Sequence, residues 1–439
     1  MPSMVPVGPF KTRKTAEGLP FPYYIIPFDK QGRCEGPATR RHLLDNLAGF
    51  SDIFLFSHGW NNDWAAATAR YESFIDGYTA QRTALGLAVP ADYRPLLVGV
   101  FWPSQTMAWF DSETGPGFAG TGPEDVESGR QLAADIASSL PDDEHQRFLE
   151  LVQAEALSPA QARDLAALLA SLARGDDEGV SRDGPDADDL LAAAAALAPP
   201  PPDFDDVDAM ASAPGSTPAA AGLGDILGKL DPRNLIKPFT VWQMKDRAGV
   251  VGSRGVSALL HELLQRSPAR IHLLGHSFGC KVVMSATAAL PSLPRKIHSA
   301  LLLQPAISQY AFAAVVPESG LPGGYLKNLA CIERPVAATF SAHDAALTKT
   351  FHLALRRKSD LGEQPEAAGS SPSKYGALGG FGPQDSAATI VEIKEPGEAY
   401  ALGAGNAIVG IRGTRRISGH GDISTPATWW LAYSLASGR

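Results

Sequence analysis

The sequence predicts an α/β protein built on a mostly parallel sheet, with helices on both faces of the sheet. Short apolar runs that are rich in β-branched and aromatic residues alternate with amphipathic helical runs along the chain. Most of the short runs are continuously apolar, which is typical of strands that are buried on both faces. The 439 residues, 44% of them hydrophobic, suffice for one large core or two ordinary ones.

Seven strands are expected, and a long insertion interrupts them. The strands cover residues 22–28, 52–57, 95–102, 270–275, 298–304, 335–341 and 406–412. The interval between the third and fourth strands is far longer than the dozen or so residues that a crossover between parallel strands needs. We therefore expect a core made of residues 1–122 and 240–439, with a helical insertion over 123–239.

Within the insertion, residues 123–174 have the pattern of helices. Residues 158–161 form a capping box, and the helix after it carries one apolar face made of Leu165, Leu168, Leu169 and Leu172. The stretch 175–222 is rich in Asp, Ala and Pro, so we expect a mobile linker there. Helical structure is expected to resume near residue 223, with the crossover helix back to the sheet over 246–267. A second irregular stretch, a long surface loop, is expected over 359–386.

Composition excludes some classes of partner. A formal net charge of -9 argues against a nucleic-acid-binding protein, which needs a basic surface to neutralise phosphates. The three cysteines show no CxxC pair and fit a reducing compartment. The N-terminal residues lack the apolar run of a secretory signal, and no stretch reaches the roughly 18 apolar residues of a membrane span. We expect a cytoplasmic protein without a transmembrane segment, although export by a route without a signal stays open, as does the oligomeric state.

The motif GHSFG at 275–279 carries the strongest chemical signal. It follows the apolar run RIHLL and precedes the helical run CKVVMSATAAL, which is the strand, turn and helix context of a G-x-S-x-G nucleophile elbow. In that context Ser277 is the candidate nucleophile, at a helix start that favours a developing oxyanion. The alternative is a plain Gly-Ser turn between a buried strand and a helix.

The segment SHGWNND at 57–63 follows another apolar run and is expected to form an oxyanion loop. A tetrahedral intermediate needs two converging N–H donors, and the backbone of Trp60 and of Phe278 is the natural pair. His58 is interpreted as a structural histidine rather than a catalytic one. Asn62 and Asp63 are interpreted as helix caps rather than substrate ligands.

A serine nucleophile needs a general base, and among the ten histidines His420 is the candidate. It follows the last expected strand and lies in a glycine-flanked loop, in the chain order Ser, acid, His. Asp344, just past the strand 335–341, is the candidate acid, with helix capping as its alternative role. Asp422 lies too close to His420 in sequence to orient it and is assigned to a turn.

A metal site formed by His343, Asp344, His420 and Asp422 is the weaker interpretation, because their spacing does not set two ligands on one helix face. We therefore expect no metal and no cofactor.

The ordered set HGW, GHSFG, SAHD and HGD resembles the α/β-hydrolase superfamily, and SHGWNND with QMKDRAGVVG at 243–252 is similar to a bacterial branch of it. The resemblance covers roughly residues 20–110 and 240–439. It implies a triad of Ser277, Asp344 and His420, an oxyanion hole from Trp60 and Phe278, and no cofactor.

The sequence thus predicts a serine hydrolase that cleaves a small-molecule or lipid ester through an acyl-enzyme intermediate. A thioesterase, peptidase or acyltransferase would share these residues. A catalytically inactive partner-binding protein with the same fold is the alternative from another class. The leucine face of the insertion predicts either a lid over the pocket or a surface that docks on the core or on a second protomer.

Overall fold

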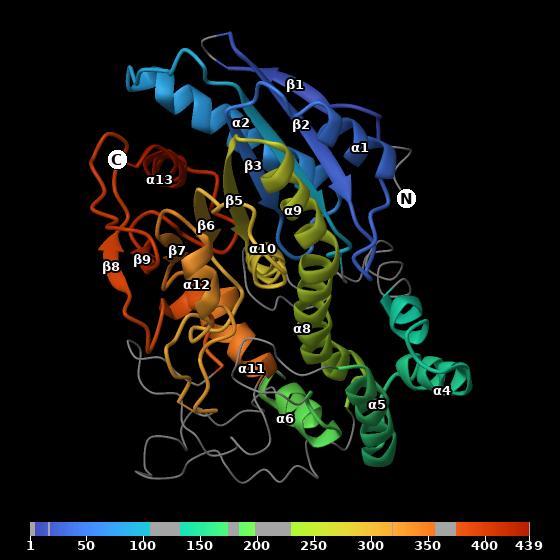
Figure 1. The fold of residues 1–439 in the computed structure, drawn as a ribbon. Helices are drawn as coiled ribbons and strands as arrows, with labels where there is room; N and C mark the ends of the chain where they lie inside the picture. The colour runs from blue at the N-terminus through green and yellow to red at the C-terminus, as the bar shows by residue number, and fades with distance from the viewer. Residues whose placement is uncertain are drawn as a thin grey trace, which may run out of the picture.

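The computed structural model describes residues 5–15, 18–105, 132–173, 184–197, 230–317, 319–355 and 375–438. They form an α/β protein around one nine-stranded sheet (Figure 1). The strands are β1 (Lys11–Lys14), β2 (Pro20–Pro27), β3 (Asp52–Ser57), β4 (Pro95–Phe101), β5 (Arg270–His276), β6 (Ser299–Leu303), β7 (Val336–Phe340), β8 (Thr389–Glu392) and β9 (Ile408–Arg412).

The sheet is parallel apart from one edge. Its order is β1-β2-β4-β3-β5-β6-β7-β9-β8, and only the pair β1 and β2 is antiparallel. The prediction of a mostly parallel sheet in an α/β protein is confirmed. Every residue of the central strands β3, β6 and β7 is buried, as their continuous apolar runs predict.

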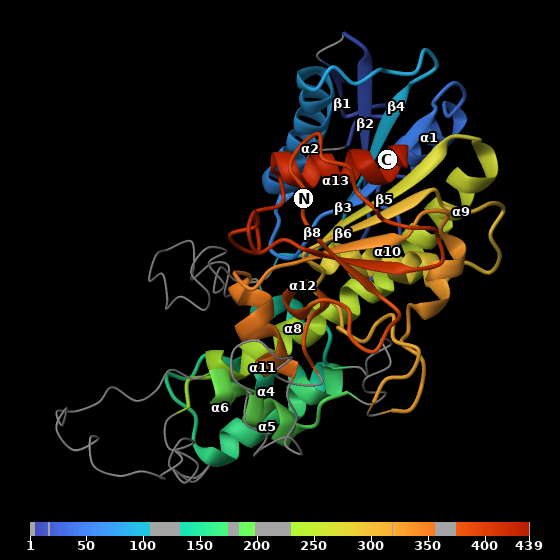
Figure 2. The ribbon, with the colours of Figure 1, turned by 90° about the vertical axis from the view of Figure 1, so that its left-hand side faces the viewer.

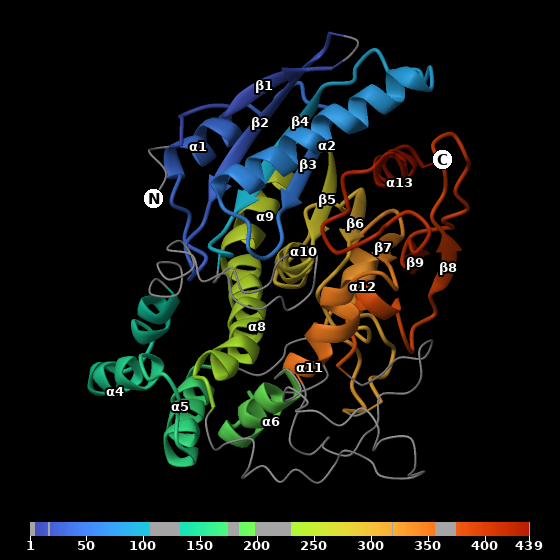
Figure 3. The same cartoon turned by 180° about the vertical axis from the view of Figure 1, so that it is seen from behind.

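Helices cover both faces of the sheet. One face carries α1 (Pro37–Asp45), α8 (Arg233–Val250), the π-helical turn η2 (Val251–Val256), α9 (Ser257–Arg266) and α10 (Phe278–Ala288). The other face carries α2 (Trp64–Ala84) and α13 (Pro426–Ser437), and Figure 3 shows α2 in front of the sheet. Each face has its own apolar cluster, so the sheet separates two cores.

The crossover helix is longer than the sequence predicts. It begins at Arg233, within the stretch from about 223 where helical structure was expected to resume, and continues without a break through η2 and α9 to Arg266. Pro238 lies inside α8, where a proline ordinarily argues against a helix. Because α8 is buried on most of its circumference, its sequence lacks the one-sided apolar pattern by which a surface helix is recognised.

Two edge strands were not predicted. β1 has the sequence KTRK and β8 the sequence TIVE, and neither contains a run of apolar residues long enough to signal a strand. β1 is held by its pairing with β2 and by ion pairs from Lys11 and Arg13 to Glu72 of α2 at 2.6 and 3.2 Å. These edge strands therefore form because of tertiary contacts rather than local strand propensity.

The insertion contributes α4 (Asp142–Val152), α5 (Pro159–Leu172) and α6 (Ala187–Leu197), which lie together at one end of the molecule (Figure 2). The capping box at Ser158 is confirmed. Leu165 and Leu169 of α5 are fully buried in the apolar cluster that also contains the α8 face of the sheet. The leucine face thus packs within this chain, against α6 and α8.

Part of each expected irregular stretch is helical. Residues 187–197 of the expected linker form α6, while 175–183 and 198–222 lie outside the described residues. Of the expected loop over 359–386, residues 359–374 lie outside the described part, and Leu378–Phe381 form the short helix α12. η3 (Leu326–Cys331), the π-helical turn η4 (Ala346–Thr350) and α11 (Phe351–Leu355) complete the described elements named here.

Two further properties bear on the expected environment of the protein. In the described part of the chain, no helix combines the length and the apolar character that crossing a membrane requires. Cys34, Cys280 and Cys331 are free thiols.

Candidate active site

Ser277 lies on a sharp turn between β5 and α10. Its φ of 55° and ψ of -126° are unusual for a residue with a side chain, and such strain persists only where the surroundings hold it. The turn is held by two backbone hydrogen bonds, from Ser277 N–H to the Leu303 carbonyl (3.1 Å) and from Ala306 N–H to the Ser277 carbonyl (3.2 Å). The turn presents the serine side chain at the carboxyl ends of the parallel strands.

Glycine at position 279 lets the turn pack against the end of β3. A Cβ atom built there would lie 2.2 Å from the Ser57 carbonyl oxygen and 2.4 Å from that of His58. Any larger residue at position 279 would push α10 away from β3.

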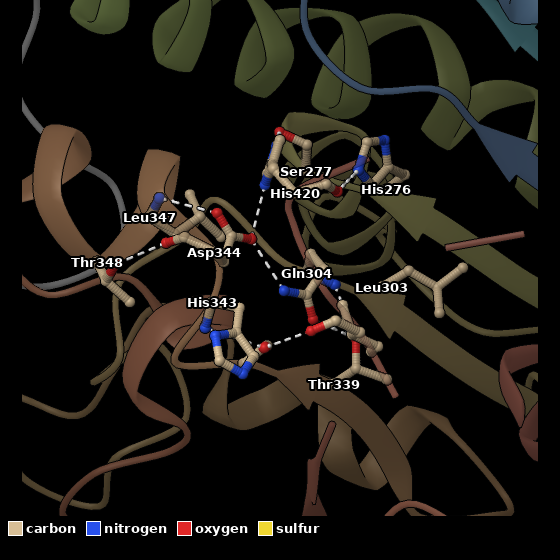
Figure 4. A network of polar contacts seen from close by, with 12 residues as sticks. His276, Ser277, Leu303, Gln304, Thr339, His343, Asp344, Leu347, Thr348 and His420 are labelled. Carbon is tan, nitrogen blue, oxygen red and sulfur yellow. Dashed lines mark hydrogen bonds and ion pairs between the residues drawn. The ribbon is translucent and has the colours of Figure 1, made fainter. Parts of the chain in front are cut away.

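His420 joins Ser277 and Asp344 in one hydrogen-bonded chain (Figure 4). Its Nε2 lies 2.8 Å from the Ser277 Oγ, and its Nδ1 lies 2.8 Å from the Asp344 Oδ2. The three residues come from the ends of β5, β7 and β9, so the parallel sheet brings together side chains that are 76 and 143 residues apart. Since a carboxylate only accepts, Nδ1 carries the proton and Nε2 is the atom that can accept the serine proton.

The carboxylate of Asp344 is fully buried, and each of its oxygens accepts hydrogen bonds. Oδ1 accepts the Leu347 N–H at 3.0 Å, in the manner of a helix cap, while Oδ2 accepts from His420 and from the Gln304 amide at 2.9 Å. Capping and contact with the histidine are therefore performed by different oxygens of one side chain.

The loop that carries His420 is tied to the elbow by His276. The His276 Nε2–H donates to the His420 carbonyl at 2.9 Å, and the two rings lie 5.0 Å apart. Burial, together with the positive charge of Arg70, holds the pKa of His276 well below its ordinary value, so this imidazole is neutral. Asp422 accepts the N–H and the hydroxyl of Ser418, both at 2.9 Å, which is the turn role expected from the sequence.

The expected oxyanion loop passes directly beside Ser277. A Cβ atom built on Gly59 would lie 2.8 Å from the Ser277 Cβ, so only glycine allows this approach. The Asn62 side-chain amide donates to the carbonyls of Gly59 (3.1 Å) and Trp60 (2.8 Å). In a planar trans peptide the Trp60 N–H points opposite to the Gly59 carbonyl, and hence away from Asn62.

Phe278 supplies the second expected donor. It is the first residue of α10. The first N–H groups of a helix have no carbonyl acceptor within the helix, so the Phe278 N–H is one of these donors. Its ring meets the ring of Trp60 edge-on at 5.9 Å. The structure thus brings together all five residues singled out for chemistry from the sequence.

His58 is a buried part of the loop framework. Its Nδ1–H donates to the Gly59 carbonyl at 2.9 Å, and its Nε2 accepts the Trp102 N–H at 3.3 Å. The ring stacks on the Trp102 indole, and burial lowers the pKa of His58 to about 4. This is the structural role expected from the sequence. Asp63 caps α2 through the Ala66 N–H, also as expected, whereas Asn62 braces the loop and is not a cap.

Several polar side chains of the site were not predicted from the sequence. Gln304 and Thr339 lie near the carboxyl ends of β6 and β7, and Ser104 hydrogen-bonds the backbone of Asn62. The signal that could have found Gln304 is its position directly after a buried parallel strand, where functional side chains gather in open α/β sheets.

Metal ligation has little support in this part of the molecule. Across the described ranges, no group of three or more His, Cys, Asp or Glu side chains is arranged to hold a metal ion. His343 is exposed, and Asp422 is engaged with Ser418.

Comparison of this chain with protein-family models, with curated proteins and with solved structures finds no match in any of the three.

Proposed function

We propose that this chain is a serine hydrolase of the α/β-hydrolase type, which cleaves a carboxylic ester through an acyl-enzyme intermediate. The observation that carries the proposal is the pair of 2.8 Å contacts from His420 to Ser277 and to Asp344, on a serine with a positive φ. The Ser277 backbone is strained, the Asp344 carboxylate is buried, and the three residues follow three different strands. Packing alone does not require a Ser-His-Asp chain, so nucleophilic catalysis is the better explanation.

In the proposed cycle His420 Nε2 accepts the Ser277 proton as the Oγ attacks the ester carbonyl carbon. The oxyanion is stabilised by the N–H groups of Trp60 and Phe278. His420 returns its proton to the leaving alkoxide, which departs as the alcohol. A water molecule, deprotonated by His420, then attacks the acyl-enzyme, and Ser277 regains its hydrogen as the acid leaves. Asp344 holds the imidazole with its proton on Nδ1 throughout.

The proposed substrate is a small-molecule or lipid ester. The proposed reaction needs no cofactor, and the proposed location of the protein is the cytoplasm. The free thiols are consistent with that compartment.

The proposal is tested by labelling with a fluorophosphonate probe, which reacts with activated serines, on the wild type, Ser277→Ala and His420→Ala. Labelling of the wild type alone, with turnover of p-nitrophenyl esters, is the expected result. Folded wild-type protein that neither labels nor turns over any ester would favour the partner-binding alternative. Turnover of thioesters in place of esters would move the proposal to a thioesterase.

A further inference from the structure

Gln304 is held in a strained and fully buried position at the end of β6. Its φ is 45°, in the left-handed region, although it is not a glycine, and its side chain has no exposed surface. Holding a long polar side chain there requires that its hydrogen bonds be satisfied, because a buried amide without partners is costly. Gln304 meets that condition with two side chains, Thr339 and Asp344.

Asp344 and Thr339 together fix the orientation of the Gln304 amide. The Thr339 Oγ1 accepts the Gln304 backbone N–H at 2.9 Å, and its own hydrogen goes to the Gln304 Oε1 at 3.0 Å. The amide nitrogen is left to point at the carboxylate, where Nε2 lies 2.9 Å from Oδ2. The flipped amide would set the Gln304 carbonyl oxygen against the Asp344 Oδ2, two acceptors at hydrogen-bond distance, so the contact with the carboxylate excludes it.

The Asp344 oxygen that Gln304 contacts is the one that accepts the His420 Nδ1–H. Oδ2 therefore accepts two hydrogen bonds and Oδ1 one, from the Leu347 N–H. Rotation of the carboxylate about its Cβ–Cγ bond would break all three hydrogen bonds.

We propose that Gln304, oriented by Thr339, is a positioning residue that fixes the Asp344 carboxylate and moderates the negative charge facing His420. This inference rests on the proposed hydrolase function and adds a residue to its machinery. Gln304 touches neither the substrate nor the reacting atoms, and it acts on the reaction through Asp344.

Three substitutions separate positioning from mere structural support. Gln304→Met keeps the length of the side chain but removes the donor, and kcat is expected to fall roughly tenfold to a hundredfold, the range of one hydrogen bond to a charged group. KM is expected to stay within about twofold, since substrate binding is not altered. Thr339→Val, nearly isosteric, removes the orienting hydrogen bonds and is expected to lower kcat less. The double variant Gln304→Met with Thr339→Val is expected to have almost the same kcat as Gln304→Met alone, because the two residues act as one unit.

The pH profile gives the sharper readout. In Gln304→Met the acidic limb of kcat/KM is expected to move to higher pH, because a carboxylate that loses a donor attracts the imidazolium more strongly. In Gln304→Glu the introduced carboxyl can donate to Asp344 only while it is protonated. Activity is therefore expected to fall again at higher pH, as the two carboxylates come to repel each other.

The experiment measures kcat, KM and the pH profile for wild type and these variants, with the spectrum of the His420 Nδ1 proton recorded by NMR. Loss of that resonance in Gln304→Met, which would show that the His420 contact with Asp344 is no longer held, supports the proposal without any need for turnover. A kcat within about twofold of wild type in Gln304→Met, or a Gln304→Glu profile that matches wild type, would overturn it. Wild-type protein without labelling or turnover would refute the hydrolase function instead, and the resonance would still report whether Gln304 orients Asp344.

Discussion

Acid should destabilise this protein through His58, the buried histidine in the loop that follows β3. Its imidazole accepts the Trp102 N–H on Nε2, so a proton can be added there only by breaking that hydrogen bond in a site without exposed surface. Burial lowers the pKa of His58 from 6.5 to about 4 in the folded chain, whereas the unfolded chain keeps the ordinary value.

The sign and size of the effect follow from linkage. A group whose pKa is lower in the folded state contributes stability that is complete above its unfolded pKa and is lost as the pH falls towards its folded pKa. The full gap of roughly 2.5 pH units corresponds to about 3 kcal/mol. Between about pH 7.5 and about pH 4.5 the loss attributable to His58 is about 2.5 kcal/mol.

The assay is urea unfolding, followed by tryptophan fluorescence at both pH values, for wild type, His58→Gln and His343→Gln. Burial also lowers the pKa of His272 and His276, so the wild type loses additional stability with acid, and the comparison of variants isolates His58. His58→Gln starts less stable but should lose about 2.5 kcal/mol less on acidification. The exposed His343→Gln serves as the matched control and should follow the wild type. Equal acid losses in all three proteins would refute the reasoning.

Three further outcomes are expected. Gly59→Ala should abolish ester turnover, because its Cβ would lie 2.8 Å from the Ser277 Cβ. The variant is expected to fold at low temperature, which circular dichroism would check. Normal turnover by the folded variant would contradict this prediction. His276→Leu should lower kcat roughly tenfold by freeing the His420 carbonyl, and His276→Gln should restore part of the loss through its amide donor; equal rates in the two variants would show that the hydrogen bond is unimportant. Leu169→Ala should cost about 2 to 5 kcal/mol in the stability of the insertion, measured by limited proteolysis of α5. If the insertion acts as a lid over the pocket, the same variant should change the preference for acyl-chain length, and an unchanged preference would support the docking alternative.

The central strands could be predicted because burial on both faces leaves an unmistakable sequence pattern. β3, for example, has the sequence DIFLFS, and the structure begins and ends it at the predicted residues. The edge strands β1 and β8 could not be predicted, because pairing and ion pairs with distant residues form them. Helical structure was expected from about residue 223, but a crossover helix that runs continuously from Arg233 was not, because a helix buried on several sides shows its period less clearly.

At the candidate site, the sequence identifies residues whose chemistry depends on local context. Ser277 is marked by its glycines and by the strand before it, and His420 by its place after the last expected strand. The positions of the residues that orient them, one within the GHSFG motif and one directly after a buried strand, do not reveal which groups they contact. Gln304 and His276 act through single hydrogen bonds across the sheet ends, whose partners are 40 and 144 residues away. Only the three-dimensional arrangement brings those donors to their acceptors.

The most direct test of the central claim is to trap the acyl-enzyme. The wild type would be mixed with p-nitrophenyl acetate and quenched in acid within the first turnover, and its peptides would be analysed by mass spectrometry. One acetyl group is expected on the Ser277 hydroxyl of the wild type, with none in Ser277→Ala and a strongly reduced amount in His420→Ala. Turnover without acetylation of Ser277, or acetylation that persists unchanged in His420→Ala, would contradict it.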